Sequence, residues 1–152
     1  MVMDEIDLRL IELLTSNART SYAELAAQVG LSAPSTAERV RRLEERGAVL
    51  GYAARVDPAA LGRDLTAFVS VSVGDRAQTR AFLAAVAKLP EVVECHHVAG
   101  DDDYLVKVFV DGTRGLEAFV TDQVKALPGI ARTRTTVVLS TALTRPLSPG
   151  PG

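Results

Sequence analysis

Residues 30–47 read GLSAPSTAERVRRLEERG and place four arginines close together in a chain whose net charge is only -2. On a helix that turns about 100° per residue, four polar side chains of this segment share one narrow stripe. The members of this arginine stripe are Ser35, Arg39, Arg42 and Arg46. The opposite side is small and apolar, and consists of Ala33, Thr36, Ala37, Val40 and Leu43. The pattern predicts a helix that packs with one side and presents guanidinium groups with the other.

Two shorter signals upstream predict helices before this one. Asp4 is placed to cap a helix through DEIDLRLIELL, and Ser21 with Glu24 has the spacing of a capping box that opens YAELAAQV. Gly30 ends that short helix, and Ser32 can cap the next one. This order is the helix-turn-helix arrangement: one helix, a short helix, a turn with glycine, and a last helix with exposed polar groups. In that arrangement the last helix enters the major groove of DNA.

The segment after the third helix predicts a connection to a second domain. Residues 48–57, AVLGYAARVD, alternate in a way that suits a short two-stranded wing or a connecting strand. Pro58 and Gly62 in the stretch DPAALGRD then indicate a hinge. We therefore expect a winged helix-turn-helix DNA-binding domain at residues 1–57 and a hinge at 58–64.

The remaining sequence repeats one pattern twice. TAFVSVSV (66–73) and DYLVKVFV (103–110) are alternating strands, and FLAAVAKLPEV (82–92) and FVTDQVKALPGI (119–130) are helices that end in Leu-Pro before another strand. A repeated βαβ unit gives βαββαβ, a ferredoxin-like four-stranded antiparallel sheet with both helices on one face. We expect an α+β protein with this domain at residues 65–143 and a disordered tail at 144–152.

Alternation along the two strands predicts that the second sheet face is partly apolar. Six valines point to one side: Val69, Val71, Val73, Val106, Val108 and Val110. Phe68, Leu105 and Phe109 point to the other side, which two helices on the first face leave uncovered. A second copy of the chain is the simplest cover, so we expect a homodimer.

Composition excludes several other classes of protein. The 152 residues include no apolar run of about 18 residues, and the acidic start MVMDEIDLRL is unlike an export signal, so a cytoplasmic protein is expected. The only cysteine, Cys95, cannot form a disulfide within the chain or a zinc site by itself. Phosphate loops, nucleophile elbows and metal-ligand clusters are missing, so we expect no enzyme, cofactor or metal. The alternative is a metabolite-binding or catalytic ferredoxin-like module whose N-terminal helices serve only dimerisation.

Four segments, in order, resemble the Lrp/AsnC, or feast/famine, family of transcriptional regulators. They are DEIDLRLIELLTSNART, GLSAPSTAERVRRLEERGAVLGYAARVDPAALG, GDDDYLVKV and LPGIARTRTTVVL. The resemblance implies sequence-specific binding to double-stranded DNA, dimers formed through the C-terminal sheets, frequent octamers or spirals, and modulation by a small molecule, usually an amino acid.

The expected DNA-binding residues lie in and beside the third helix. Ser35, Thr36 and Arg39 are early enough to reach base edges, and Arg42 and Arg46 are placed for phosphates. The full set is Ser32, Ser35, Thr36, Arg39, Arg41, Arg42 and Arg46. Residues 1–62 hold seven arginines against nine carboxylates, so one copy would bind DNA weakly and several copies must act together.

The resemblance also implies an effector cleft. It would consist of Gly100, Asp102, Asp103, Tyr104, Leu105, Thr133, Arg134, Thr135 and Thr136. A carboxylate can hold an ammonium group, and hydroxyls with an arginine can hold a carboxylate, so an amino acid fits. The family usually has an apolar or aromatic residue at the place of Asp102, which favours a polar or cationic amino acid here. As a metal site, GDDDY is less favoured than a solvated loop, and His96 and His97 should point to opposite faces of a strand.

Overall fold

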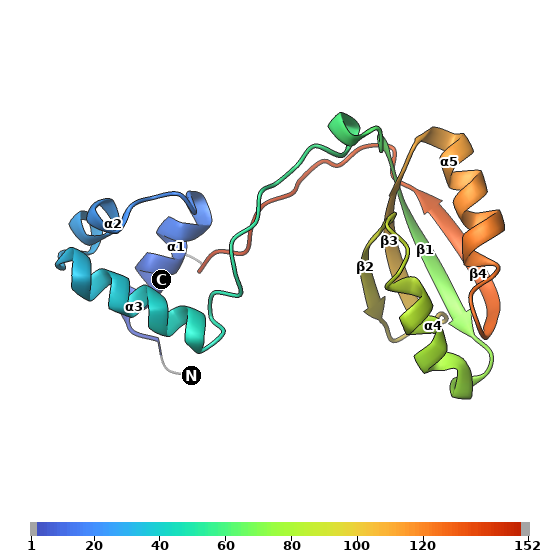
Figure 1. The fold of residues 1–152 in the computed structure, drawn as a ribbon, viewed down its shortest axis with the longest axis horizontal. Coiled ribbons are helices and arrows are strands. Elements are labelled where there is room, and N and C mark those ends of the chain that lie inside the picture. Colours follow the sequence, from blue (N-terminus) through green and yellow to red (C-terminus); the bar gives the residue numbers. More distant parts are fainter. Residues whose placement is uncertain (1–2, 150–152) are drawn as a thin grey trace. The chain divides into compact units, whose positions relative to one another are not determined.

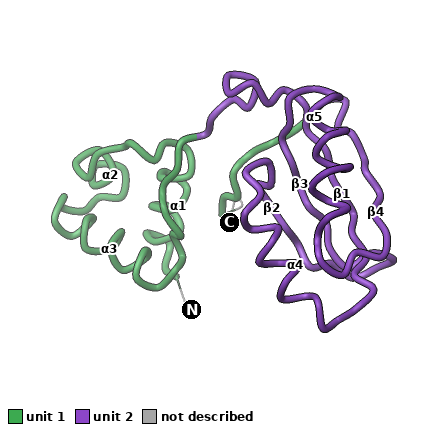
Figure 2. Tube along the Cα trace, turned by 45° about the vertical axis from the view of Figure 1, so that its right-hand side comes forward, with its two compact units in different colours: residues 1–54, 143–152 green, residues 55–142 purple. Residues whose placement is uncertain are grey.

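The structure is a computed structural model and describes residues 3–149. The chain divides into two compact units (Figure 2). One unit contains residues 1–54 and 143–152, and the other is Arg55–Ala142. The division falls shortly before the segment expected to be a hinge. There, Pro58–Leu61 form one 3-10 turn, and Arg63 donates a hydrogen bond to the carbonyl oxygen of Pro90 at 2.6 Å.

The N-terminal unit has the three helices that the sequence predicts (Figure 1). Helix α1 is Glu5–Ser16, α2 is Tyr22–Val29 and α3 is Ala33–Glu45. Asp4 caps α1, Ser21 and Glu24 form the capping box of α2, and Ser32 caps α3. Gly30 turns the chain between α2 and α3 with φ 69°, a conformation that favours glycine. The core of this unit contains Leu10, Leu14, Leu25, Val40 and Leu43. The predicted helix-turn-helix is confirmed.

The wing is absent from this structure. Residues 48–57 are extended or turn-like, and within the described part of the chain every strand belongs to the C-terminal sheet. Ala48 and Val49 pack against the core of the N-terminal unit, whereas Leu50 is 94% exposed and Val56 is 57% exposed, so the later side chains of this segment face solvent. Alternation alone does not make a strand, because a strand needs a neighbour for its backbone hydrogen bonds. The alternative reading of this segment, a connection, is the one that its conformation fits.

The C-terminal unit has the βαββαβ order (Figure 1). Strand β1 is Leu65–Val73, helix α4 is Thr79–Val86, β2 is Val92–His97, β3 is Tyr104–Val110, α5 is Gly112–Ala118 and β4 is Ile130–Val137. Helix α5 continues directly into a π-helical turn, η3, at Phe119–Val124, and a short 3-10 turn, η2, at Arg76–Gln78 precedes α4. The sheet order is β2-β3-β1-β4, and all three neighbouring pairs are antiparallel. The ferredoxin-like prediction is confirmed.

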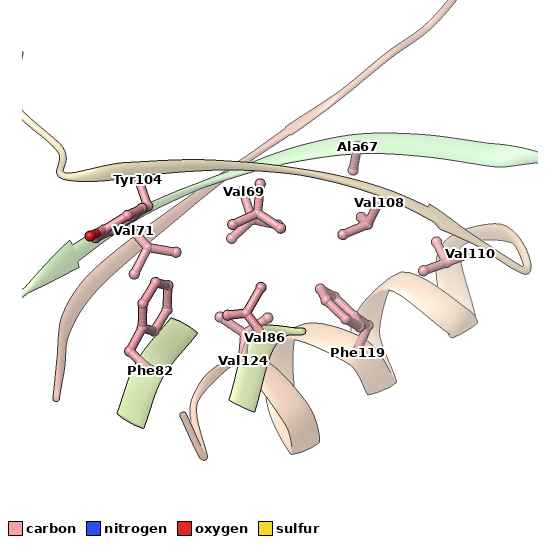
Figure 3. Packing of buried hydrophobic residues seen from close by; sticks show 11 residues of the cluster. Ala67, Val69, Val71, Phe82, Val86, Tyr104, Val108, Val110, Phe119 and Val124 are labelled. Atoms are coloured by element: carbon pink, nitrogen blue, oxygen red, sulfur yellow. The ribbon is translucent and has the colours of Figure 1, made fainter. Parts of the chain in front are cut away.

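Both helices of this unit cover the same face of the sheet. Figure 3 shows Phe82 and Val86 from α4, with Phe119 and Val124 from the second helical segment, pointing toward the valines of β1 and β3. The register pairs Val69 with Val106 and Ala67 with Val108, so these side chains share the covered face. The other face, here called the open face, includes Phe68, Ser70, Ser72, Leu105, Lys107, Phe109, Arg132, Arg134 and Thr136. The predicted distribution of apolar residues between the two faces is confirmed.

The last described residues form no helix or strand after β4 ends at Val137. Leu143 and Leu147 are 70% and 94% exposed. The expected disorder of residues 144–152 stays a prediction, and its last three residues lie outside the described residues. Within the described range, no helix is long and apolar enough to span a membrane.

Candidate DNA-binding and effector sites

The outer side of α3 is polar and exposed, as the arginine stripe predicts. Ser32 and Ser35 lie at the start of the helix, where their hydroxyl oxygens are 2.9 Å apart. Arg41 pairs with Glu38 and Glu45 on the same helix, and these bonds with nearby charges raise its pKa. Ion pairs of this kind between exposed side chains are weak, so they compete poorly with a phosphate.

Arg42 and Arg46 are the most available cations of the stripe. Only Nε of Arg42 is engaged, with Glu38 Oε1 at 3.0 Å, and its two terminal nitrogens form no hydrogen bond with the described residues. Arg46, which is exposed, forms no side-chain hydrogen bond or ion pair with any residue of the described range. A guanidinium with free terminal nitrogens can bind a phosphate with two hydrogen bonds. This geometry fits the phosphate-binding roles expected for both residues.

Thr36 does not lie on the DNA-facing side. Its side chain is fully buried, at 0% exposure, beside Val40 and Leu43 on the packed face of α3. Thr36 follows Ser35 by one residue, which turns it about 100° away from the stripe. The prediction that Thr36 reaches base edges is therefore wrong. The same periodicity that places Thr36 opposite the arginines is the signal that identifies its buried position.

Arg39 is directed toward helix α1. One of its terminal nitrogens donates to Asp4 Oδ2 at 2.7 Å and to Asp7 Oδ1 at 2.8 Å. These bonds, first the one to Asp4 and then the one to Asp7, raise the pKa of Arg39. The pKa of Asp4 is lowered by the backbone N–H of Asp7 and then by Arg39. The two carboxylates are separated from Arg39 by more than 30 positions, so no local sequence pattern reveals them.

Asp102 is the centre of a polar cluster on the C-terminal sheet. Its side chain is only 7% exposed and accepts hydrogen bonds from Ser72 Oγ at 2.9 Å, Arg132 at 3.1 Å and Arg134 at 2.8 Å. The hydrogen bond from Ser72, followed by the two arginines, lowers the pKa of Asp102. Because the chain itself neutralises Asp102, this carboxylate no longer gives a reason to expect a polar or cationic amino acid rather than an apolar one. Sequence reasoning missed Ser72 and Arg132.

Strand alternation separates the expected effector residues. Arg134 and Thr136 pair across from Ser70 and Phe68, and therefore share the open face with Leu105. Thr133 and Thr135 pair with Val71 and Val69, and therefore belong to the opposite side of β4. Within one chain these four β4 residues cannot form a single cleft. Gly100 is exposed in the loop before β3, with φ 143°.

A cavity beside that loop contains two of the expected residues. It has a volume of about 340 Å³ and is lined by Val73, Arg76, Thr79, His97, Asp103 and Tyr104. Asp103 Oδ2 accepts a hydrogen bond from the backbone N–H of Val73 at 2.8 Å, while its Oδ1 has no partner among residues 3–149. The cavity therefore contains the guanidinium of Arg76, a carboxylate oxygen of Asp103 without a partner among the described residues, and the hydroxyl of Thr79. Groups of these kinds can bind a zwitterion.

The two histidines lie as predicted on opposite sides of β2. His96 pairs across from Leu105 and bonds to Glu94 at 3.0 Å, whereas His97 pairs across from Tyr104 and stacks on its ring at 5.1 Å. Burial raises the pKa of Cys95, which disfavours a reactive thiolate. Among residues 3–149, no group of three or more histidine, cysteine or carboxylate side chains is arranged to hold a metal ion.

Comparison with known proteins agrees with both units. Residues 3–44 match the AsnC-type helix-turn-helix domain, and residues 66–147 match the Lrp/AsnC ligand binding domain. The leucine-responsive regulatory protein of Salmonella typhimurium is 40% identical over 139 residues, which cover 90% of this chain and 85% of that protein. The Bkd operon transcriptional regulator of Pseudomonas aeruginosa is 36% identical over 151 residues, 97% of each chain.

A solved structure of a transcriptional regulator from Neisseria meningitidis, in complex with L-methionine, superposes with a TM-score of 0.90. It is 30% identical and covers 95% of this chain and 94% of its own. The fold and these similarities define a DNA-binding transcriptional regulator. The chain belongs to the Lrp/AsnC family. The rival interpretation, in which the N-terminal helices serve only dimerisation, does not account for the helix-turn-helix match.

Proposed function

We propose that this regulator acts in the cytoplasm, binds DNA through the outer face of α3 and responds to an amino acid held beside the β2–β3 loop. The observation that supports the response is the cavity lined by Arg76, Asp103 and Thr79. Two relatives bear on the ligand class: one is named for a response to leucine, and a solved neighbour contains L-methionine. Because Asp102 is neutralised within the chain, an apolar amino acid fits as well as a cationic one.

The cavity can bind the two charged groups common to all amino acids. The guanidinium of Arg76 is suited to the carboxylate, and the free oxygen of Asp103 is suited to the ammonium group. Tyr104, His97 and Val73 provide the less polar wall on which a side chain can rest. Specificity among amino acids would then come from this wall, because the charged pair recognises every amino acid in the same manner.

Removing either charge should weaken the binding of every amino acid. We expect Arg76→Ala to lower the affinity for L-methionine and L-leucine about 10- to 100-fold, since a hydrogen bond to a charged group contributes about 1.5–3 kcal/mol. Asp103→Asn should have a similar effect while its amide oxygen still accepts from the N–H of Val73. Calorimetric titration of the full chain measures both changes.

Arg80→Ala is the matched control for this titration, because Arg80 is an exposed arginine of α4, directly after the turn that holds Arg76, and is not part of the cavity wall. The proposed site is refuted if Arg76→Ala binds both amino acids as tightly as the wild type. Weak binding by Arg80→Ala would show instead that any loss of charge in this region has the same effect.

The open face supports a second proposal, that the chain forms a homodimer through its sheet. Phe68, Leu105 and Phe109 lie on this face, and the two helices of the unit are on the other one. A dimer would also raise the number of phosphates that the protein contacts, which one chain of low net charge needs for firm binding. Two α3 helices would address half-sites about one helical turn, roughly 34 Å, or a multiple apart.

A charge in the middle of the open face should separate the copies. We expect Leu105→Arg to convert the dimer to monomers at micromolar concentration, because a desolvated charge without a partner opposes association. Sedimentation velocity measures this change, and Leu83→Arg, at a 40% exposed position on α4, is the control. A Leu105→Arg protein that sediments like the wild type would place the contact between copies elsewhere.

A further inference from the structure

The ion-pair cluster of Arg39, Asp4 and Asp7 joins the first and third helices. A single terminal nitrogen of Arg39 serves both carboxylates, at 2.7 and 2.8 Å. Asp4 is the N-cap of α1, and Asp7 lies one turn further along the same helix. The cluster therefore connects the beginning of α1 with the middle of α3, the helix that faces DNA.

Asp7 depends on this contact more than Asp4 does. The Asp7 side chain is only 12% exposed, and it lies on the face of α1 that also buries Leu10 and Leu14. A buried carboxylate is unfavourable unless a cation or hydrogen-bond donor compensates it. Among residues 3–149, Arg39 is the only side chain that bonds to the Asp7 carboxylate. Arg39 is thus held in place by a charge that would otherwise be buried alone.

The position of Arg39 within the stripe agrees with this assignment. Arg39 is rotated about 40° from Ser35 toward the packed side of the helix, whereas Arg42 and Arg46 stay within about 20° of Ser35. Its side chain is 30% exposed, compared with 56% for Arg42. A groove of about 260 Å³ lies beside the cluster and is lined by Asp4, Asp7, Arg39, Arg42, Leu43 and Arg46.

The two carboxylates in that groove reduce the attraction of Arg39 for a DNA phosphate. Its single positive charge already faces two negative ones, so a phosphate that approaches Arg39 would also approach Asp4 and Asp7. Arg42 and Arg46, further along the groove, have free guanidinium nitrogens. Phosphate binding is therefore favoured at Arg42 and Arg46 and disfavoured at Arg39.

We propose that Arg39, Asp4 and Asp7 form a positioning clamp: they fix the direction of α3 relative to α1 so that Arg42, Arg46 and Ser35 meet DNA together, and Arg39 itself contacts neither base nor phosphate. This replaces the expectation from sequence that Arg39 reads base edges. The clamp depends on the DNA binding of the family and is independent of the proposed effector site.

Asp4 and Asp7 could either repel DNA or position α3, and these two roles predict opposite changes in DNA affinity when one of the carboxylates is neutralised. If Asp4 and Asp7 only repel DNA, then Asp7→Asn and Asp4→Asn should tighten binding. If they position α3, both substitutions should weaken it. Asn caps a helix as well as Asp does, so Asp4→Asn keeps the start of α1 while it removes half of the ion pairing.

The experiment measures affinity for a duplex selected by the wild-type chain from a random pool, between 50 and 200 mM salt. We expect Asp7→Asn and Arg39→Met each to weaken binding about tenfold, with the double variant no weaker than either single one. The slope of log affinity against log salt should not change, because each lost phosphate contact would reduce it by about 0.9. Arg39→Lys, which retains a cation for the two carboxylates, should recover part of the loss.

Glu12→Gln is the matched control, since Glu12 is an exposed carboxylate of α1 that pairs with Arg9 and takes no part in the groove. Tighter binding by Asp4→Asn or Asp7→Asn would overturn the proposal, as would a reduced salt slope for Arg39→Met. If Asp7→Asn fails to fold, Asp4→Asn decides the question, because its melting temperature should stay close to that of the wild type while its DNA affinity falls.

Discussion

Replacing Arg42 and Arg46 with alanine should reduce DNA affinity about a thousandfold at 0.1 M salt, if each neutralises one phosphate in each copy of a dimer. Four lost contacts, each changing the salt slope by about 0.9, lower the slope by about 3.6. Both residues are exposed and have unengaged terminal nitrogens, so little in the free protein opposes these contacts. Fluorescence anisotropy with a labelled duplex over a range of salt concentrations gives affinity and slope together.

Arg9→Ala is the control for this double variant. Arg9 is an exposed arginine of α1 that pairs with Glu12, outside the stripe and the groove. Its removal changes the net charge but should leave the slope within about one unit of the wild-type value. An Arg42→Ala/Arg46→Ala protein with an unchanged slope would assign the phosphate contacts to other residues.

Phe82→Ala should destabilise the C-terminal unit by about 3–5 kcal/mol, the usual cost of truncating a buried phenylalanine. Phe82 is 0% exposed and lies against Tyr104, with ring centroids 5.0 Å apart, between α4 and the sheet (Figure 3). Since domains are stable by only about 5–15 kcal/mol, this loss removes a large part of the stability of the unit. Urea unfolding followed by circular dichroism measures the loss.

The next residue of the same helix provides the comparison. Leu83 is 40% exposed, so Leu83→Ala removes a side chain of α4 that is not in the core and should cost less than about 1 kcal/mol. Equal costs for Phe82→Ala and Leu83→Ala would contradict the packing shown in Figure 3.

Most of the fold follows from signals that are local in the sequence. Ser21 with Glu24, and Gly30 followed by Ser32, determine hydrogen bonds within a few residues, and these form as expected. The pattern of a helix followed by Leu-Pro also lies within one short segment each time it occurs, and its repetition identifies the second domain. The sequence allows a wing or a connection at residues 48–57, and the wing does not form, because alternation does not reveal whether a partner strand exists.

The candidate sites depend on contacts between distant residues, which local patterns cannot reveal. Arg39 looks like any other member of the stripe until Asp4 and Asp7 are placed beside it. In the sequence Asp102 has no visible partner, whereas in the structure it accepts hydrogen bonds from Arg132 and Arg134, which are 30 and 32 residues away. In both cases the sequence gives the charge of a residue but not the partner that neutralises it.

The sheet order β2-β3-β1-β4 leaves β2 and β4 as edge strands. The outer edge of such a strand has unpaired backbone groups that can recruit strands from other molecules and start aggregation. On β4, Arg132 and Arg134 keep more than half of their side chains exposed, and Asp102 holds both in place. Because the two arginines share one carboxylate, they leave a net positive charge beside β4. Charged side chains next to an edge strand oppose its pairing with the same edge of another copy.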